Sequence, residues 1–423
     1  MIKQALKKGQ LYINYLGPSS AVLGNLIATP ILISNLGLNQ WSLFALINIL
    51  LPLVYLILFG SSEIVRRLMI NIFLINEKTK KSIDLFFKYE KKIFIRFFPG
   101  ILILSITLIL FSSNNYPTFE KIELSFFFIS IAVLIKMFEF YYSELLNGLK
   151  QHYKLHIYGF IITFLKWSTI IYLSFLSKVN INTLLIAMII FSFCMIIVQR
   201  ILILNFFHDT QKKSNIQNKE LVSEFNEKKF GITIFLLLLL QHFNKIIAFG
   251  ILDTKSISYF GIAFMLSSVV PLIIAPIVVY LTPEIYETAE LSTKNRKEKF
   301  SRFLIIQLSV ITTLLIITNL FLEPILALWL GKKINHLDVL LFLIPLSIST
   351  LSTTMLTSLK ILFIAENKIY FMRRPLELVF FLFIFLTTMM YFQTITVEIY
   401  LYCLSILKFF LAIYFYIIFL KKI

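Results

Sequence analysis

The sequence predicts an all-α, polytopic membrane protein with 12 transmembrane helices in two pseudo-symmetric six-helix bundles. Two observations carry most of this prediction. Of the 423 residues, 58% are hydrophobic and only 15% are charged, and the mean hydropathy is +0.86, which excludes a soluble globular protein. In addition, apolar segments long enough to cross a ~30 Å hydrocarbon core recur along the whole chain.

The apolar segments are separated by short polar or turn-forming stretches. Their approximate ranges are 11–34, 41–62, 93–112, 124–146, 156–177, 184–206, 231–252, 258–282, 303–322, 338–362, 375–393 and 397–420. The most polar stretch falls at the midpoint of the chain, so we expect an N-terminal six-helix bundle at 1–206, a cytoplasmic linker at 207–230 and a C-terminal six-helix bundle at 231–423. Weak similarity between Leu36–Pro52 and Leu252–Pro271 favours a duplicated unit.

The basic residues predict the orientation. Of the 40 Lys and Arg residues, 31 fall on or near the side that holds both termini, five fall on the opposite side, and four lie near the middle of spans. Basic residues concentrate in cytoplasmic connections, so both termini are predicted to be cytoplasmic. No small-residue cleavage site follows the basic start, and we therefore expect no removable signal peptide.

Four lysines near the middle of spans are the strongest functional signal: Lys136, Lys166, Lys245 and Lys408. Inserting a central lysine costs ~2.5–3.5 kcal/mol, and from that depth its side chain does not easily reach an interface. Such lysines are tolerated where they face a wet cavity or a counter-ion. A cavity lined by lysines is cationic, which predicts an anionic substrate.

Each lysine also has a structural interpretation. Lys136 and Glu139 are three residues apart and can pair on one helical face, either as a self-neutralised contact or as a pair in which a substrate phosphate competes with Glu139. Lys166 and Lys408 have no carboxylate one helical turn away, so they need partners from other helices or a cavity.

Polar residues extend the set of substrate-binding candidates. Asn244 and Lys245 fall on one helical face with Gln241, an arrangement that equally suits a hydrogen-bonded contact between helices. No metal-ligand cluster or catalytic motif is evident, and no cofactor is expected.

Two further candidates lie within the first span and just after the second. Asn25 shares a face of the first span with Asn14 and Thr29, and Arg66 follows the second span with Glu63 as its expected neighbour. Trp41, Tyr141 and Tyr142 are interpreted as lipid-interface anchors rather than as platforms that stack on sugars. The basic stretch 77–92 is either a charged loop that sets the topology or a partly amphipathic segment that lays Ile83, Phe86, Phe87 and Tyr89 on the anionic leaflet surface.

Several segments resemble bacterial polysaccharide flippases of the Wzx type, in the multidrug/oligosaccharidyl-lipid/polysaccharide (MOP) exporter superfamily. The similar segments are PILISNLGLNQWSLFAL (Pro30–Leu46), FGSSEIVRR (Phe59–Arg67), LLNGLKQHYKLHIYGFI (Leu145–Ile161), HFNKIIAFGILDTKSISYFGIAFML (His242–Leu266) and LEPILALWLGKKI (Leu322–Ile334). In the seventh span the family often has an Asp before a basic residue, where this chain has Asn244 before Lys245. The departure puts an ion-coupling role at that position in doubt.

The resemblance implies a non-enzymatic flippase of the bacterial inner membrane. It would move undecaprenyl-diphosphate-linked oligosaccharide repeat units by alternating access, for O-antigen or capsule biosynthesis. Membrane lipids, a polymerase and a chain-length regulator of the pathway are the expected partners, and nucleic acid is not. The alternatives are a multidrug antiporter, a lipid II flippase and a membrane polysaccharide polymerase. A cationic drug would favour buried carboxylates, lipid II flippases usually have fourteen spans, and a polymerase would need a large or acidic outer loop.

Overall fold

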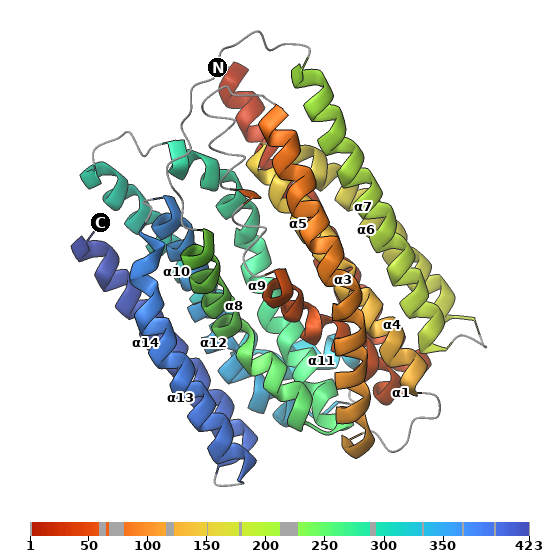
Figure 1. Cartoon of the computed structure of the whole chain (residues 1–423). Helices are drawn as coiled ribbons and strands as arrows, with labels where there is room; N and C mark the ends of the chain where they lie inside the picture. Colours follow the sequence, from red (N-terminus) through yellow and green to blue (C-terminus); the bar gives the residue numbers. More distant parts are fainter. Residues whose placement is uncertain are drawn as a thin grey trace. The chain divides into compact units, whose positions relative to one another are not determined.

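The structure is a computed structural model. It describes residues 2–58, 65–66, 80–115, 122–149, 151–176, 180–211, 227–287, 293–331, 334–365, 368–392 and 395–422. Every described element of regular structure is helical (Figure 1). The elements are α1 (Ile2–Leu58), α3 (Lys80–Asn115), α4 (Ile122–Leu134), α5 (Lys136–Gly148), α6 (His152–Ser174), α7 (Ile181–Gln211), α8 (Glu227–Ile251), α9 (Thr254–Glu287), α10 (Thr293–Leu320), α11 (Leu322–Leu330), α12 (His336–Ala365), the 3₁₀ helix η2 (Ile369–Met372), α13 (Arg373–Tyr391) and α14 (Val397–Lys422).

The predicted all-α polytopic fold is confirmed. Seven helices among the described residues are long and apolar enough to cross a membrane by length and composition. The first two predicted spans both lie in α1, which is kinked at Gly37, where φ is 80° and only glycine is unstrained. The fourth predicted span is divided between α4 and α5 at Ile135.

The chain divides into two compact units. The N-terminal unit comprises residues 1–36 and 50–235, and the C-terminal unit comprises residues 37–49 and 236–423. The kink at Gly37 therefore lies where the chain passes from the first unit into the second. Within the N-terminal unit α7 packs against α4, α5 and α6, and within the C-terminal unit α12 packs against α9, α10 and α14.

Both units contain a close glycine–tryptophan contact. In the N-terminal unit, a Cβ added at Gly24 of α1 would lie only 1.9 Å from Cδ1 of Trp167 on α6. In the C-terminal unit, a Cβ added at Gly261 of α9 would lie 3.0 Å from Ala45 and 3.2 Å from Trp41. Each glycine lets a large indole approach a helix backbone closely, as small residues do between membrane helices.

The first half of α1 and α6 run in the same direction. Gly24 contacts Trp167, and further along both helices Asn35 Nδ2 donates to the Ser174 carbonyl oxygen at 3.0 Å. Spans one and five run the same way in the predicted alternation of the chain across the membrane, and the two contacts agree with that alternation.

Most of the aromatic residues considered for the membrane interface lie inside a unit instead. Phe86, Tyr89, Tyr141 and Tyr142 are buried in the N-terminal unit, and Trp41 is buried in the C-terminal unit. For these five the interfacial interpretation is wrong, because their rings fill the interior between helices, while Phe87 alone of the set remains exposed. An aromatic residue near a span end packs equally well against lipid or protein, so its type alone does not decide which way it faces.

Candidate functional site

The pairing of Lys136 with Glu139 is present in the structure. Both residues lie in the first turn of α5, and the ammonium of Lys136 forms an ion pair with Oε2 of Glu139. The two side chains are 19% and 24% exposed, so the pair is mostly but not completely enclosed. Because both side chains belong to one helix and stay partly exposed, Lys136 can exchange Glu139 for another anion by a change of side-chain conformation alone.

Lys166 adds a third charge to this pair. It is half-buried on α6, and its ammonium lies 4.9 Å from the centroid of the Trp167 ring, a cation–π contact. Lys136 and Glu139 lie close enough for their charges to influence Lys166, although no hydrogen bond or ion pair joins Lys166 to either residue in the described part of the chain. We call Lys136, Glu139 and Lys166 the three-charge cluster, and its formal net charge is positive.

The candidate Asn25 lies on α1, one residue after Gly24, the glycine that contacts Trp167. Asn25 is half-buried. The carbonyl oxygen of Asn25 accepts a hydrogen bond from Thr29 Oγ1 at 2.8 Å. Asn14, the third residue of the predicted polar face, has a side chain outside the described residues.

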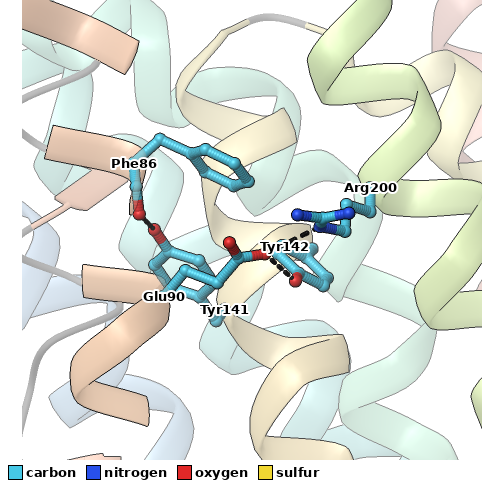
Figure 2. Close-up of polar contacts among 5 residues, drawn as sticks. All are labelled: Phe86, Glu90, Tyr141, Tyr142 and Arg200. Atoms are coloured by element: carbon cyan, nitrogen blue, oxygen red, sulfur yellow. Dashed lines mark hydrogen bonds and ion pairs between the residues drawn. The ribbon is translucent and has the colours of Figure 1, made fainter. Parts of the chain in front are cut away.

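Just beyond Glu139 on the same helix, four consecutive residues of α5 bind four different partners. Two of these contacts hold α5 against α3, one holds it against α7 and one joins it to Arg66. Two of them appear in Figure 2. Tyr141 donates to the Phe86 carbonyl oxygen at 2.8 Å, Tyr142 donates to Glu90 Oε1, Ser143 accepts from Gln199 at 2.9 Å, and Glu144 accepts from Arg66 at 2.7 Å.

Arg66 binds a carboxylate that was not among the candidates from the sequence. Its Nη1 forms an ion pair with Glu144, 78 residues away in the chain, and its expected neighbour Glu63 lies outside the described residues. Glu90 and Arg200 were not candidates from the sequence either. Their ion pair joins α3 to α7 across 110 residues at 2.9 Å, and no local spacing signals such a contact.

Lys408 occupies a different environment in the C-terminal unit. Its side chain lies on α14 and is 0% exposed. The ammonium donates to the backbone oxygen of Gln241 on α8 and to Oγ of Ser349 on α12, both at 3.2 Å. The two acceptors are neutral, and the contact joins three helices.

The rest of the predicted polar face on α8 is only partly described. Gln241 Nε2 donates to Thr357 Oγ1 at 3.3 Å, which adds a second link between α8 and α12. The side chains of Asn244 and Lys245 lie outside the described residues. The structure also reveals Lys360, a buried lysine in α12 that was not among the candidates.

Comparisons with solved structures identify the class of fold. The chain matches the MATE multidrug transporter DinF-BH, solved with a bound ligand, with a TM-score of 0.64 and 14% identity over 99% of this chain and 95% of that chain. It matches a MOP superfamily transporter from Pyrococcus furiosus, whose binding pocket is described as having reverse polarity, with a TM-score of 0.61 and 12% identity over 97% and 94% of the two chains.

The chain therefore has the fold of MATE transporters in the MOP superfamily, a twelve-helix membrane fold. These neighbours are transporters rather than enzymes. Neither a scan against protein-family models nor a search of curated proteins finds a match. Sequence identities of 12% and 14% establish only a shared fold, so the substrate has to be inferred from this chain's own residues.

Proposed function

We propose that this chain is a flippase for undecaprenyl-diphosphate-linked oligosaccharide repeat units in a bacterial inner membrane. The observation that carries the proposal is the three-charge cluster of the N-terminal unit. A diphosphate brings at least two negative charges, and the two ammonium groups of the cluster exceed its single carboxylate by one charge. The diphosphate would take the place of Glu139 beside Lys136 and would also be attracted by Lys166.

The cluster suits reversible binding better than permanent binding. A substrate that displaces Glu139 leaves that carboxylate partly exposed rather than stranded in the interior, so the exchange costs less than breaking a fully buried pair. A transporter has to release its cargo on the far side of the membrane, and a competing internal carboxylate helps to do so. Alternating access then needs no bond chemistry, in keeping with the transporter fold.

A multidrug transporter is the second candidate. The solved neighbours include proteins described as multidrug transporters, and Glu139, Glu90 and Glu144 supply carboxylates within the N-terminal unit. All three carboxylates are already paired with a lysine or an arginine, which leaves little attraction for a cationic drug. A lipid II flippase would share the anionic diphosphate and would differ in the attached sugar.

Proteoliposomes that contain the purified chain can separate these candidates. We expect a fluorescent polyprenyl-diphosphate oligosaccharide to reach the opposite leaflet in a protein-dependent way, while a cationic dye such as rhodamine is not moved. Transport of the dye without transport of the lipid-linked sugar would favour the multidrug antiporter. In cells, deletion of the gene should cause lipid-linked repeat units to accumulate on the inner leaflet, before the polymerase and the chain-length regulator can act on them.

The proposed orientation has its own experiment. A single cysteine at Lys332, in a background that lacks both native cysteines, should react with a membrane-impermeant reagent added to intact cells, and a cysteine at Lys213 should be protected. The reverse result would place both termini outside. Because the orientation rests on basic residues alone, this labelling is independent of the substrate.

A further inference from the structure

Arg200 is an arginine on an otherwise apolar, exposed helix face. On α7 the exposed side chains recur at helical spacing, at Ile190, Phe193, Ile197 and Ile201. Arg200 lies within this stripe, and its side chain is 45% exposed. In a membrane protein an exposed apolar stripe faces lipid, so the guanidinium lies at the lipid-facing surface of the N-terminal unit.

The depth of Arg200 matches the lipid headgroups. The apolar span of α7 begins at Ile181 and ends at His208. Arg200 is 19 residues beyond Ile181 in the sequence, which at 1.5 Å per residue corresponds to about 29 Å, close to the ~30 Å thickness of a hydrocarbon core. If the core begins at Ile181, it ends near Arg200 on the side predicted to be cytoplasmic, and about the last two turns of the apolar span, as far as His208, lie at the interface.

The guanidinium of Arg200 is oriented by the protein, as Figure 2 shows. Its Nε donates to Oε1 of Glu90 at 2.9 Å, and the same oxygen accepts the hydroxyl of the buried Tyr142. Glu90 itself is 15% exposed and is held between α5 and α7. An arginine has five N–H donors, and no second carboxylate pairs with Arg200 in the part of the chain that the structure describes. Terminal nitrogens consequently remain for an external anion.

We infer that Arg200 binds the phosphate group of an anionic phospholipid of the inner leaflet, at the seam between α3 and α7. Planar guanidinium groups bind phosphate oxygens through paired hydrogen bonds, and Glu90 holds this one in a fixed orientation beforehand. The neighbouring end of α3 contributes exposed Lys88 and Lys91, so its charge also suits an anionic lipid. The occupant is a resident lipid that stabilises this seam, separate from any transported cargo.

The test measures lipid binding to the purified full-length chain in detergent by native mass spectrometry. The probes are phosphatidylglycerol and a diacylglycerol with the same acyl chains and no phosphate. We expect phosphatidylglycerol to bind the wild type in preference to diacylglycerol. In Arg200→Gln its affinity should fall at least tenfold, which corresponds to about 1.4 kcal/mol. Arg200→Lys keeps the charge and the pairing with Glu90 but loses the planar guanidinium. Its affinity for phosphatidylglycerol should therefore lie between those of the wild type and Arg200→Gln.

The matched control is Arg302→Gln. Arg302 is also an exposed arginine on the predicted cytoplasmic side, 75% exposed, but its Nη2 pairs with Glu298 of its own helix at 2.6 Å. If Arg302→Gln lowers phosphatidylglycerol binding as much as Arg200→Gln does, general charge explains the binding and the site is refuted. Unchanged binding in a folded Arg200→Gln or Arg200→Lys variant refutes it as well. Retention of undecaprenyl diphosphate but not of phosphatidylglycerol at Arg200 would assign the site to the cargo instead.

Discussion

Lys136 in the N-terminal unit and Lys408 in the C-terminal unit were both mid-span candidates from the sequence, and the structure places them in environments that differ in burial and in partners. Lys136 is 19% exposed and paired with a carboxylate, whereas Lys408 is 0% exposed and donates to a backbone carbonyl and a hydroxyl. The ammonium of Lys136, beside a partly exposed carboxylate, can change partners. The ammonium of Lys408 cannot leave these acceptors unless α8, α12 and α14 move apart.

A lysine in the middle of a span is therefore not by itself evidence of a binding site. The insertion cost of a lysine is met equally by an exchangeable counter-ion or by fixed neutral oxygens, and only the first leaves charge available to a substrate. We therefore propose that Lys136 and Lys166 bind the cargo and that Lys408 mainly holds helices of the C-terminal unit together. Lys245 stays a candidate from the sequence.

The largest expected effect would come from removing both lysines of the three-charge cluster. Each lost charged contact costs about 1.5–3 kcal/mol, so Lys136→Gln with Lys166→Gln should lower affinity for the lipid-linked diphosphate about 100-fold or more. The readout is export of surface polysaccharide at matched expression. Replacement by arginine at both positions should retain part of the export.

Lys136→Gln leaves Glu139 without its lysine, so the double variant Lys136→Gln/Glu139→Gln is needed to separate folding from transport. Lys408→Gln should impair export less than the cluster variants do. Wild-type export from well-expressed cluster variants would refute the cationic-site mechanism, and a greater loss from Lys408→Gln would reverse the comparison.

The second effect concerns the two glycine–tryptophan contacts. Gly24→Ala puts a methyl group 1.9 Å from Trp167, and we expect it to destabilise the chain by about 1–3 kcal/mol through overpacking. Gly261→Ala meets its neighbours at 3.0 Å and 3.2 Å, so small shifts and the better helix propensity of alanine should leave it close to neutral. Thermal unfolding in detergent compares the two, and equal melting temperatures would contradict the contact at Gly24.

A smaller effect is expected from removing one charge in each unit without a polar replacement. Lys408→Met loses the hydrogen bonds to α8 and α12 but also removes the cost of burying an ammonium, so the two effects should partly offset and stability should change by less than about 1.5 kcal/mol. Lys136→Met should be more destabilising, because it leaves the mostly enclosed Glu139 without its partner. A stability loss at Lys408 larger than at Lys136 would show that the neutral contacts matter more than the ion pair.

The smallest effect is expected at the exposed pair Arg302–Glu298. Its side chains are 75% and 56% exposed and belong to one helix four residues apart. Such pairs contribute about 0.3–0.5 kcal/mol, so Arg302→Gln should leave the melting temperature nearly unchanged. The melting temperature of this variant is the baseline for judging the interior substitutions. A clear change in it would indicate that thermal unfolding in detergent is also sensitive to surface charge.

Much of the fold could be predicted from the properties of short sequence segments. The spans were predicted because hydrophobicity and a rise of 1.5 Å per residue are properties of short segments. The Lys136–Glu139 pair was predicted for the same reason, since three residues along a helix bring two side chains together. The bend at Gly37 lies in the interval 35–40 between two predicted spans, where glycine allows the positive φ.

The partners between helices could not be predicted. Arg66 and its partner Glu144 are 78 residues apart in the chain, and Arg200 and Glu90 are 110 apart. The two oxygens that Lys408 contacts belong to residues 167 and 59 positions away from it. The burial of Trp41, Tyr141 and Tyr142 was mispredicted for a related reason. Lipid and protein interior are both apolar, so a membrane helix carries little sequence signal for the face that packs inward.

The sequence by itself determined that this chain is helical, crosses a membrane many times and carries lysines where the hydrocarbon core should be. Only the tertiary structure decided which of those lysines is paired with a partly exposed carboxylate and which is fully buried and donates to a backbone carbonyl and a hydroxyl. The physical reason is that insertion depends on the local composition of each helix, whereas the role of a buried charge depends on atoms that other helices bring to it.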